Sequence, residues 1–334
     1  MEYLNNLQNS PLISVLIPVH NSERFLNKCL SSIINQTYTN IEIICNDDAS
    51  TDKSLSMLKS FAKQDKRIKI IQNKTNFGEN KTRKNLIDKI NGEYFIFIDS
   101  DDYIEKNFIQ KMYETIIIDR SDLVECNVNM IKIGNRKTDF TVKKFGVFTA
   151  NQYINFYKAV LWNKLFKTDI VRKNKINFPT DKSITCGFDK FFNFEYITLS
   201  NKVSVINNKL YNYVIHNSST LSTMREDQIL SDFYSLNSCY DFLQNKDLFV
   251  KFNVPYFKLM NKFKRKLLKS DVFYNVALKQ INILNKKIYR DHRYIYFLFL
   301  LFGYIKNMFS IQSSLDGRYK IISLFNLKFT ILKK

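Results

Sequence analysis

The first 126 residues alternate between short apolar runs and stretches in which apolar residues recur at helical spacing. The apolar runs predict strands at Ile13–Val19, Ile41–Cys45, Ile68–Ile71, Tyr94–Ile98 and Leu123–Cys126. Helical spacing lies between them, over residues 25–34, 55–62, 77–90 and 108–117. Strands joined by single helices form a mostly parallel sheet through right-handed crossovers, with helices on both faces. The sequence therefore predicts an α/β, Rossmann-like fold.

The C-terminal third differs from this pattern in its charge. Of the 334 residues, 241–334 include 19 Lys and Arg but only 5 Asp and Glu, which accounts for most of the formal net charge of +20. Basic and aromatic residues interleave there without a repeat. We therefore predict two parts, an α/β domain over residues 1–240 and a mainly helical, basic region over residues 241–334.

The cysteines and the apolar segments of the sequence indicate the cellular compartment in which the protein is expected. The 5 cysteines are odd in number and include no Cys-x-x-Cys pair, which argues against a disulfide framework and a zinc site. The N-terminus lacks the basic and apolar regions of a signal peptide. The apolar run Tyr294–Ile305 covers roughly 18 Å as a helix, against a hydrocarbon core of about 30 Å. A cytoplasmic protein is the expectation.

Polar clusters follow the predicted strands. His20 and Asn21 come after the first strand, and Asp47 and Asp48 after the second. Asn76 follows the third, and the run Asp99–Asp102 follows the fourth. Ligands of open α/β sheets bind beyond the carboxyl ends of the strands. These clusters are therefore expected to converge on one site.

Asp99, Asp101 and Asp102 end an apolar run abruptly. Carboxylates in an Asp-x-Asp arrangement can hold Mn2+ or Mg2+, since both cations prefer oxygen ligands and are often shared with substrate phosphates. The alternative is that these acids cap the following helix. Their position after a buried strand favours the metal site.

The other clusters also allow two interpretations. Asp47 and Asp48 can accept a hydrogen bond from a base imide, or can form a turn and an N-cap. Asn76-Phe77-Gly78 is typical of a turn before a helix, from which Arg83 can reach a phosphate or a carboxylate.

Taken in order, these motifs resemble a known family. They are Pro18-Val19-His20-Asn21, Asp47-Asp48-Ala49-Ser50-Thr51-Asp52, Asn76-Phe77-Gly78 with Arg83, and Asp99-Ser100-Asp101-Asp102. The set is similar to the nucleotide-sugar domain of family 2 inverting glycosyltransferases of the GT-A fold, over roughly residues 12–222. The resemblance implies a donor site lined by Pro18, Asn21, Asn76 and Arg83, a base contact from Asp47 or Asp48, a ribose contact from Asp99, a metal ligand in Asp101, and Asp102 on the acceptor side or at the next helix.

The resemblance continues into the second half of the domain. Trp162-Asn163-Lys164-Leu165-Phe166 matches a Trp-x-Lys-Leu-like segment, which implies Trp162 on the acceptor side and Lys164 near the acceptor or the donor phosphates. The usual Glu-Asp pair implies that Asp189 is the catalytic base, although Phe188 stands where glutamate is usual. Tyr211-Asn212-Tyr213 followed by His216 is similar to a loop over the diphosphate. His216 is then a metal or phosphate ligand, or else a surface histidine.

The implied activity is inverting transfer of a sugar from a UDP-sugar to a hydroxyl of a lipid-linked or cell-surface glycan, such as lipooligosaccharide or capsule, with Mn2+ or Mg2+. A nucleotidyltransferase is an alternative, but residues 19–22 contain no glycine for a phosphate loop. A basic nucleic-acid-binding protein is another, but the chain has no recognition module or RNP-like motif. No nucleic-acid partner is therefore expected.

The basic region points to a membrane surface. Lys262–Lys269 and the aromatic run Tyr294–Phe309 are typical of a surface that lies on an anionic bilayer. The ending after Arg318 is similar to the tail of bacterial surface-polysaccharide glycosyltransferases. The alternative is that these apolar residues pack on the catalytic domain. A peripheral location on the inner face of the cytoplasmic membrane is the expectation.

Overall fold

The computed structural model describes residues 10–132, 140–179, 188–216, 226–267, 274–292, 309–313, 319–324 and 327–332. The chain divides into two compact units, Met1–Lys258 and Leu259–Lys334. Helix α9 (Glu226–Asn245) spans residue 240, where the sequence analysis places the division. The assignment of catalytic and membrane roles to residues 1–240 and 241–334 stays a prediction.

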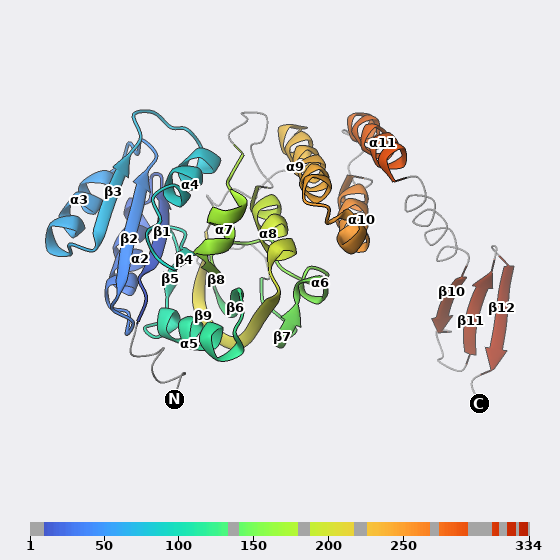
Figure 1. Ribbon diagram of the computed structural model, residues 1–334, viewed down its shortest axis with the longest axis horizontal. Coiled ribbons are helices and arrows are strands. Elements are labelled where there is room, and N and C mark those ends of the chain that lie inside the picture. Colours follow the sequence, from blue (N-terminus) through green and yellow to red (C-terminus); the bar gives the residue numbers. More distant parts are fainter. Residues whose placement is uncertain are drawn as a thin grey trace. The chain divides into compact units, whose positions relative to one another are not determined.

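The first unit is built on a nine-stranded sheet (Figure 1). Its parallel half contains β3 (Ile68–Gln72), β2 (Ile41–Asp47), β1 (Ile13–Val19) and β4 (Tyr94–Phe97), in that order. β1, β2 and β4 are almost completely buried, as expected for parallel strands covered on both faces, whereas the edge strand β3 is buried only at Ile68. The predicted strands and their helical connections are confirmed here.

The other half of the sheet is mixed. The order continues through β8 (Lys164–Lys167), β6 (Leu123–Lys132), β9 (Lys202–Ile215) and β5 (Tyr103–Ile104), and β7 (Gly146–Thr149) pairs with β9. β8 is antiparallel to both β4 and β6, while β6 and β9 are parallel. The predicted parallel sheet is therefore accurate for the first half, and the antiparallel β8 is an addition.

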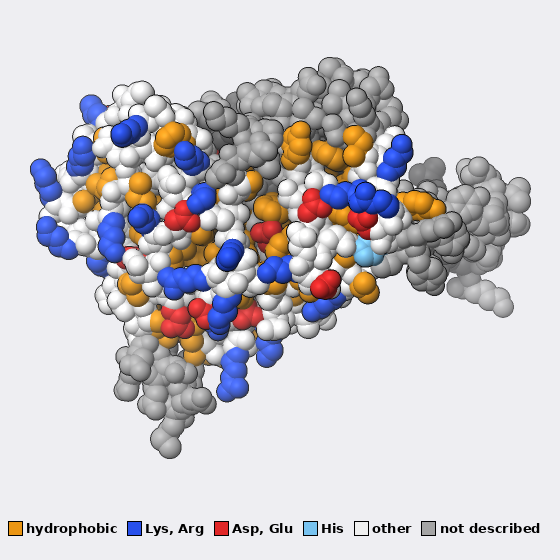
Figure 2. Space-filling view, turned by 45° about the horizontal axis from the view of Figure 1, so that its top comes forward, with side chains coloured by type: hydrophobic (Ala, Val, Ile, Leu, Met, Phe, Trp, Pro, Cys, Tyr) orange, Lys and Arg blue, Asp and Glu red, His pale blue; other side chains and the backbone are white. Residues whose placement is uncertain are grey.

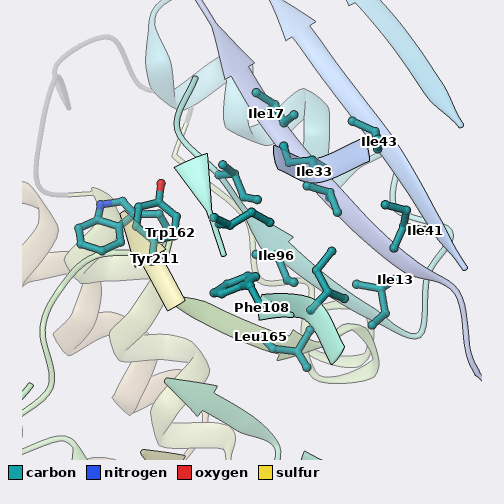
Figure 3. Close-up of a cluster of buried hydrophobic side chains, with 14 of the residues drawn as sticks. Ile13, Ile17, Ile33, Ile41, Ile43, Ile96, Phe108, Trp162, Leu165 and Tyr211 are labelled. Atoms are coloured by element: carbon teal, nitrogen blue, oxygen red, sulfur yellow. The ribbon is translucent and has the colours of Figure 1, made fainter. Parts of the chain in front are cut away.

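Helices cover both faces of the sheet. On one face, α2 (Glu23–Ile34), α3 (Ser54–Gln64) and α5 (Phe108–Asp119) pack on alternate residues of β1, β2 and β4. Figure 3 shows this cluster, in which Trp162 lies beside Tyr211. On the other face are α4 (Glu79–Ile87), whose Arg83 lies over Phe97, and α8 (Phe188–Leu199). This GT-A-like arrangement matches the predicted fold class.

The remaining elements include the helices α6 (Ala150–Tyr153), α7 (Thr168–Asn174) and α10 (Phe249–Leu267). The second unit contains α11 (Tyr274–Asp291) and an antiparallel sheet of β10 (Phe309–Ser313), β11 (Tyr319–Leu324) and β12 (Leu327–Leu332). The helices confirm the mainly helical prediction, and the small sheet is an addition. Within the described ranges, no helix is both long and apolar enough to cross a membrane. Residues 294–308 of the predicted aromatic run lie outside those ranges.

Candidate active site

The loops after β1, β2 and β4 are joined by hydrogen bonds at the carboxyl end of the sheet. Asn21 follows β1 with φ of 49°, a left-handed conformation that asparagine tolerates better than most residues. Its Oδ1 accepts a hydrogen bond from Thr51 N at 2.8 Å. The hydroxyls of Ser22 and Ser100 lie 2.6 Å apart. The predicted convergence of these three clusters is therefore observed.

The two acidic residues after β2 differ in their surroundings. Asp48 accepts hydrogen bonds from Asn73 Nδ2 at 2.7 Å, Phe77 N at 2.8 Å and Gly78 N at 2.9 Å, so its carboxylate holds the loop after β3 in place. Asp47 Oδ2 accepts one weak bond, from Ser50 N at 3.3 Å. Asp47 Oδ1 is buried and has no partner among the described residues. Asp47 therefore has the acceptor capacity that a base contact requires.

His20 connects the loops after β1, β2 and β3. Its Nδ1 donates to the Asp48 carbonyl at 2.8 Å, so Nε2 is left as an acceptor. Asn76 Nδ2 donates to that Nε2 at 3.2 Å. Pro18 is a residue of β1 beside Asn46. The structure thus brings Pro18, His20 and Asn76 to one end of the sheet.

Arg83 joins α4 to the carboxylate cluster after β4. Its side chain is only 2% exposed, and Nη2 lies 2.5 Å from Glu79 Oε1 and 3.0 Å from Asp99 Oδ1. Nη1 is buried and has no hydrogen-bond partner within the described part of the chain. A buried guanidinium with one unused edge can bind a phosphate or carboxylate oxygen of a ligand.

The three acids after β4 form one cluster. Carboxylate oxygens of Asp99, Asp101 and Asp102 lie within 4.8 Å of one another. Burial raises the pKa of Asp99 to about 6; Arg83 opposes this rise, and the charges of Asp101 and Glu79 add to it. Closely spaced carboxylates of this kind favour a cation, because it relieves their mutual repulsion.

Asp102 has a structural position within this cluster. Its Oδ2 accepts from the Tyr211 hydroxyl and its Oδ1 from Val214 N, both at 2.7 Å. Because both oxygens bind β9 and the side chain is buried, the structure does not support the expected place of Asp102 on the acceptor side. Asp102 instead anchors the strand that leads to His216.

Asp101 and His216 meet across this site. His216 Nε2 donates to Asp101 Oδ2 at 2.8 Å, and its ring stacks on Phe25 at 4.8 Å between centroids. The Asp101 side chain is 34% exposed, the most open of the three carboxylates. The two residues that the resemblance implies as metal ligands therefore lie within hydrogen-bonding distance of each other. His216 directly follows β9, and the rest of the predicted loop, from Asn217, lies outside the described residues.

Asp189 lies in the first turn of α8. Its Oδ1 is buried and has no hydrogen-bond partner in the described part of the chain. Burial raises the pKa of Asp189 to about 7; Arg83 and Lys164 oppose the rise, and Glu79 and Asp99 add to it. A carboxylate with such a pKa can accept a proton near neutral pH.

Phe188 occupies the position before Asp189 where glutamate is usual in the family pattern. Its side chain is buried against Phe178, with ring centroids 6.0 Å apart, and Phe178 stacks on Phe192. The position therefore belongs to the aromatic core between α8 and the sheet, where a charged side chain would be costly.

The segment around β8 is more deeply buried than expected. Trp162 stacks on Tyr211 at 4.6 Å and on Tyr213 at 5.1 Å between centroids, so it is a core residue and does not line an acceptor site. Lys164 is 0% exposed, and its ammonium binds Glu125 and three oxygens of residues 158–163. The structure thus does not support the expected contact of Lys164 with donor phosphates.

Several residues of the site were not predicted. The sequence could have indicated Glu79, because an acid four residues before Arg83 on a helix can pair with it. The sequence could also have indicated Glu125, because it is an acid inside an apolar run that ends with Cys126. Nothing in the sequence indicates Asn193, whose Nδ2 donates to the Asp189 carbonyl at 2.7 Å.

Comparison with known proteins identifies the family. The model of glycosyl transferase family 2 matches residues 14–193, which include the motifs after β1, β2, β3 and β4 as well as Asp189. The chain belongs to glycosyl transferase family 2. Membership favours sugar transfer over the nucleotidyltransferase and nucleic-acid-binding alternatives.

Named relatives agree with this assignment. EpsH of Bacillus subtilis (strain 168), named as a glycosyltransferase, is 31% identical over 245 residues, which cover 71% of each chain. The poly(ribitol-phosphate) beta-glucosyltransferase of Bacillus spizizenii is 33% identical over 216 residues, or 61% of this chain and 32% of that protein. This family 2 chain thus spans most of one relative and about a third of the other.

A solved structure supports the fold. S. aureus TarS 1-349, in complex with UDP-GlcNAc, has a TM-score of 0.59 at 19% identity, and the match covers 96% of this chain and 99% of that one. The family 2 chain therefore shares its GT-A-like architecture with TarS.

Proposed function

We propose that this chain transfers a sugar from a UDP-sugar to a hydroxyl group of a lipid-linked or cell-surface glycan, with inversion at the anomeric carbon. The observation that carries the proposal is Asp189, a buried carboxylate whose Oδ1 has no hydrogen-bond partner among the described residues and whose charge interacts with those of Arg83 and Asp99. Family membership supplies the reaction class, sugar transfer from a nucleotide sugar.

Asp189 takes the role of general base. Its carboxylate accepts the proton of the acceptor hydroxyl while that oxygen attacks the anomeric carbon and the bond to the diphosphate breaks. A single displacement of this kind inverts the anomeric configuration. A pKa of about 7 keeps enough of the carboxylate ionised at neutral pH and gives it useful basicity.

The donor lies along the ends of β1, β2 and β4 in this proposal. The free Oδ1 of Asp47 accepts a hydrogen bond from the uracil imide, and Asp99 from the ribose. The unused Nη1 edge of Arg83 donates to a donor oxygen. Pro18, Asn21 and Asn76 shape the pocket for the nucleotide. TarS, which shares the fold, binds UDP-GlcNAc, a donor of the proposed class.

Asp101 and His216 would hold a divalent cation, with Asp99 beside them. The fit rests on the carboxylate oxygens of Asp99, Asp101 and Asp102, which lie within 4.8 Å of one another, and on the open position of Asp101. A histidine nitrogen beside carboxylates suits Mn2+ better than Mg2+. When bound, the cation neutralises the negative charge that grows on the departing nucleoside diphosphate.

A thermal-shift panel tests the proposal. The full chain is heated with UDP-glucose, UDP-galactose, UDP-GlcNAc and GDP-mannose, each with and without Mn2+. At a ligand concentration of about 100 Kd, a bound ligand adds about 2.7 kcal/mol to the free energy of unfolding. We expect a rise in Tm with one or more UDP-sugars, larger with Mn2+. A rise with GDP-mannose alone, or with none of the four, would contradict the UDP-sugar proposal.

We also propose that the basic region binds an anionic membrane surface. Support comes from the excess of Lys and Arg in residues 241–334. Figure 2 shows Lys and Arg side chains of the described residues scattered over one face of the molecule. Each Lys or Arg near an anionic bilayer contributes about 1 kcal/mol, so binding by the basic region is expected to depend on many weak contacts. The full chain should sediment with vesicles that contain phosphatidylglycerol and be released by about 0.5 M salt. Equal sedimentation with neutral vesicles would contradict this.

A further inference from the structure

A buried ion pair connects β6 and β8, close to the chain that precedes β8. Glu125 of β6 and Lys164 of β8 are paired on neighbouring antiparallel strands, and Lys164 Nζ donates to Glu125 Oε1 at 3.1 Å. The Tyr153 hydroxyl donates to Glu125 Oε2 at 2.7 Å. Desolvation of two charges offsets most of the attraction in such a pair. Stability alone therefore does not account for an ion pair at this position.

The Lys164 ammonium also binds oxygen atoms of the chain that precedes β8. Besides Glu125, it donates to the Val160 carbonyl at 2.7 Å, to the Lys158 carbonyl at 3.1 Å and to Asn163 Oδ1 at 3.0 Å. The three N–H donors of the ammonium are shared among these four acceptors, so none is left for another partner. The position of the Val160 carbonyl is therefore fixed by Lys164.

The same carbonyl is bound from α8. Asn193 is fully buried, and its Nδ2 donates to the Val160 carbonyl at 3.3 Å and to the Asp189 carbonyl at 2.7 Å. One side-chain amide thus connects the chain before β8 to the turn that carries Asp189. Lys164 of β8 and Asn193 of α8 thus donate to the same backbone carbonyl, that of Val160.

We propose that Lys164 and Asn193 are positioning residues for Asp189, because both bind the Val160 carbonyl and Asn193 also binds the backbone of Asp189. The inference rests on the proposed role of Asp189 as general base. Asp189 Oδ1 has no hydrogen bond of its own among the described residues, so the backbone of its turn is what sets the direction of the carboxylate. A misplacement of about 1 Å can lower a catalytic rate about 100-fold.

The Asn193→Leu variant tests this link. Leucine has a similar branched shape but no donor, and the Val160 carbonyl keeps its bond from Lys164, so the chain should fold. We expect kcat for UDP release to fall about 10-fold while the KM for the UDP-sugar stays within about twofold. Asn193→Ala should show the same fall in kcat with little change in KM. Because alanine is smaller than asparagine, this result would exclude overpacking by leucine as the cause. Thr198→Val, which removes a hydroxyl bonded only within α8, is the matched control and should leave kcat unchanged.

The ion pair is tested by a double variant. Lys164→Met alone would leave Glu125 buried without its cation, which endangers folding. Glu125→Gln with Lys164→Met removes both charges and the Lys164 donor to the Val160 carbonyl, while the bond from Asn193 to that carbonyl remains. We expect this double variant to fold and to lose kcat about 10-fold, again with little change in KM.

The outcomes separate this inference from the proposed function. If Asp189→Asn releases UDP at the native rate, the proposed function fails. If Asp189→Asn is inactive but folded Asn193→Leu and Asn193→Ala both keep the native kcat, the positioning role of Asn193 is overturned while the base assignment stands. A native kcat in the folded double variant would likewise overturn the role of Lys164.

Discussion

The Asp189→Asn variant is expected to transfer sugar at least about 100-fold more slowly than the native chain, the loss typical of removing a general base. Asparagine keeps the size of the side chain, so α8 should form as before. It cannot accept the proton of the acceptor hydroxyl. Turnover is measured as UDP release, with the UDP-sugar that raises Tm most.

A measurement of donor binding distinguishes loss of the catalytic base from loss of the folded structure. The Tm rise produced by the UDP-sugar should be similar in Asp189→Asn and the native chain, because Asp189 faces the acceptor in the proposed mechanism. Asp169→Asn is the matched control, an exposed acid that pairs with Lys173 at 2.9 Å. A native rate in Asp189→Asn would remove this residue from the reaction.

The pH dependence follows from the same carboxylate. Burial raises the pKa of Asp189 to about 7, so below that pH the folded enzyme holds more of the protonated form, which cannot act as a base. Arg83 and Lys164 act against this rise, and Glu79 and Asp99 act with it. The value of kcat/KM should therefore increase from about pH 6 to about pH 8 and then level off. A profile that is flat across this range would contradict Asp189 as the titrating group.

The parallel half of the sheet could be predicted from sequence because burial on both faces requires nearly continuous apolar runs. Ile13–Val19 is such a run, and the predicted and observed strands coincide. β8 was missed as a strand because it has only four residues, two of them lysines. Lys164 is acceptable there only because Glu125 lies opposite on β6, a pairing between residues far apart in the sequence.

The site could be predicted only in outline. The position of Asp99 and Asp101 after a buried strand indicated a site there, and the family resemblance implied Asp189 and His216. What each carboxylate does depends on its partners. Asp102 looks like a metal ligand in sequence but is held by Tyr211 and Val214, and those contacts depend on the path of β9.

The Asp101→Ala variant is expected to lose at least about 100-fold in turnover and most of the Mn2+-dependent rise in Tm. Asp101 is the most open of the three acids after β4, and alanine removes the carboxylate that pairs with His216. Asp102 cannot compensate, because both of its oxygens are bound by β9. The fold should persist, since the lost bond is partly exposed.

Metal titration distinguishes the role of Asp101 from a general loss of charge. UDP release is followed over a range of Mn2+ concentrations in the native chain, in Asp101→Ala and in His216→Ala. Because His216 binds the same carboxylate and supplies a nitrogen ligand, His216→Ala should shift the Mn2+ midpoint to higher concentration, in the same direction as Asp101→Ala and by less. Asp169→Ala, which removes one exposed negative charge, should leave the midpoint in place. An unchanged midpoint in Asp101→Ala would place the cation elsewhere, because a carboxylate that holds the ion cannot be removed without weakening its binding.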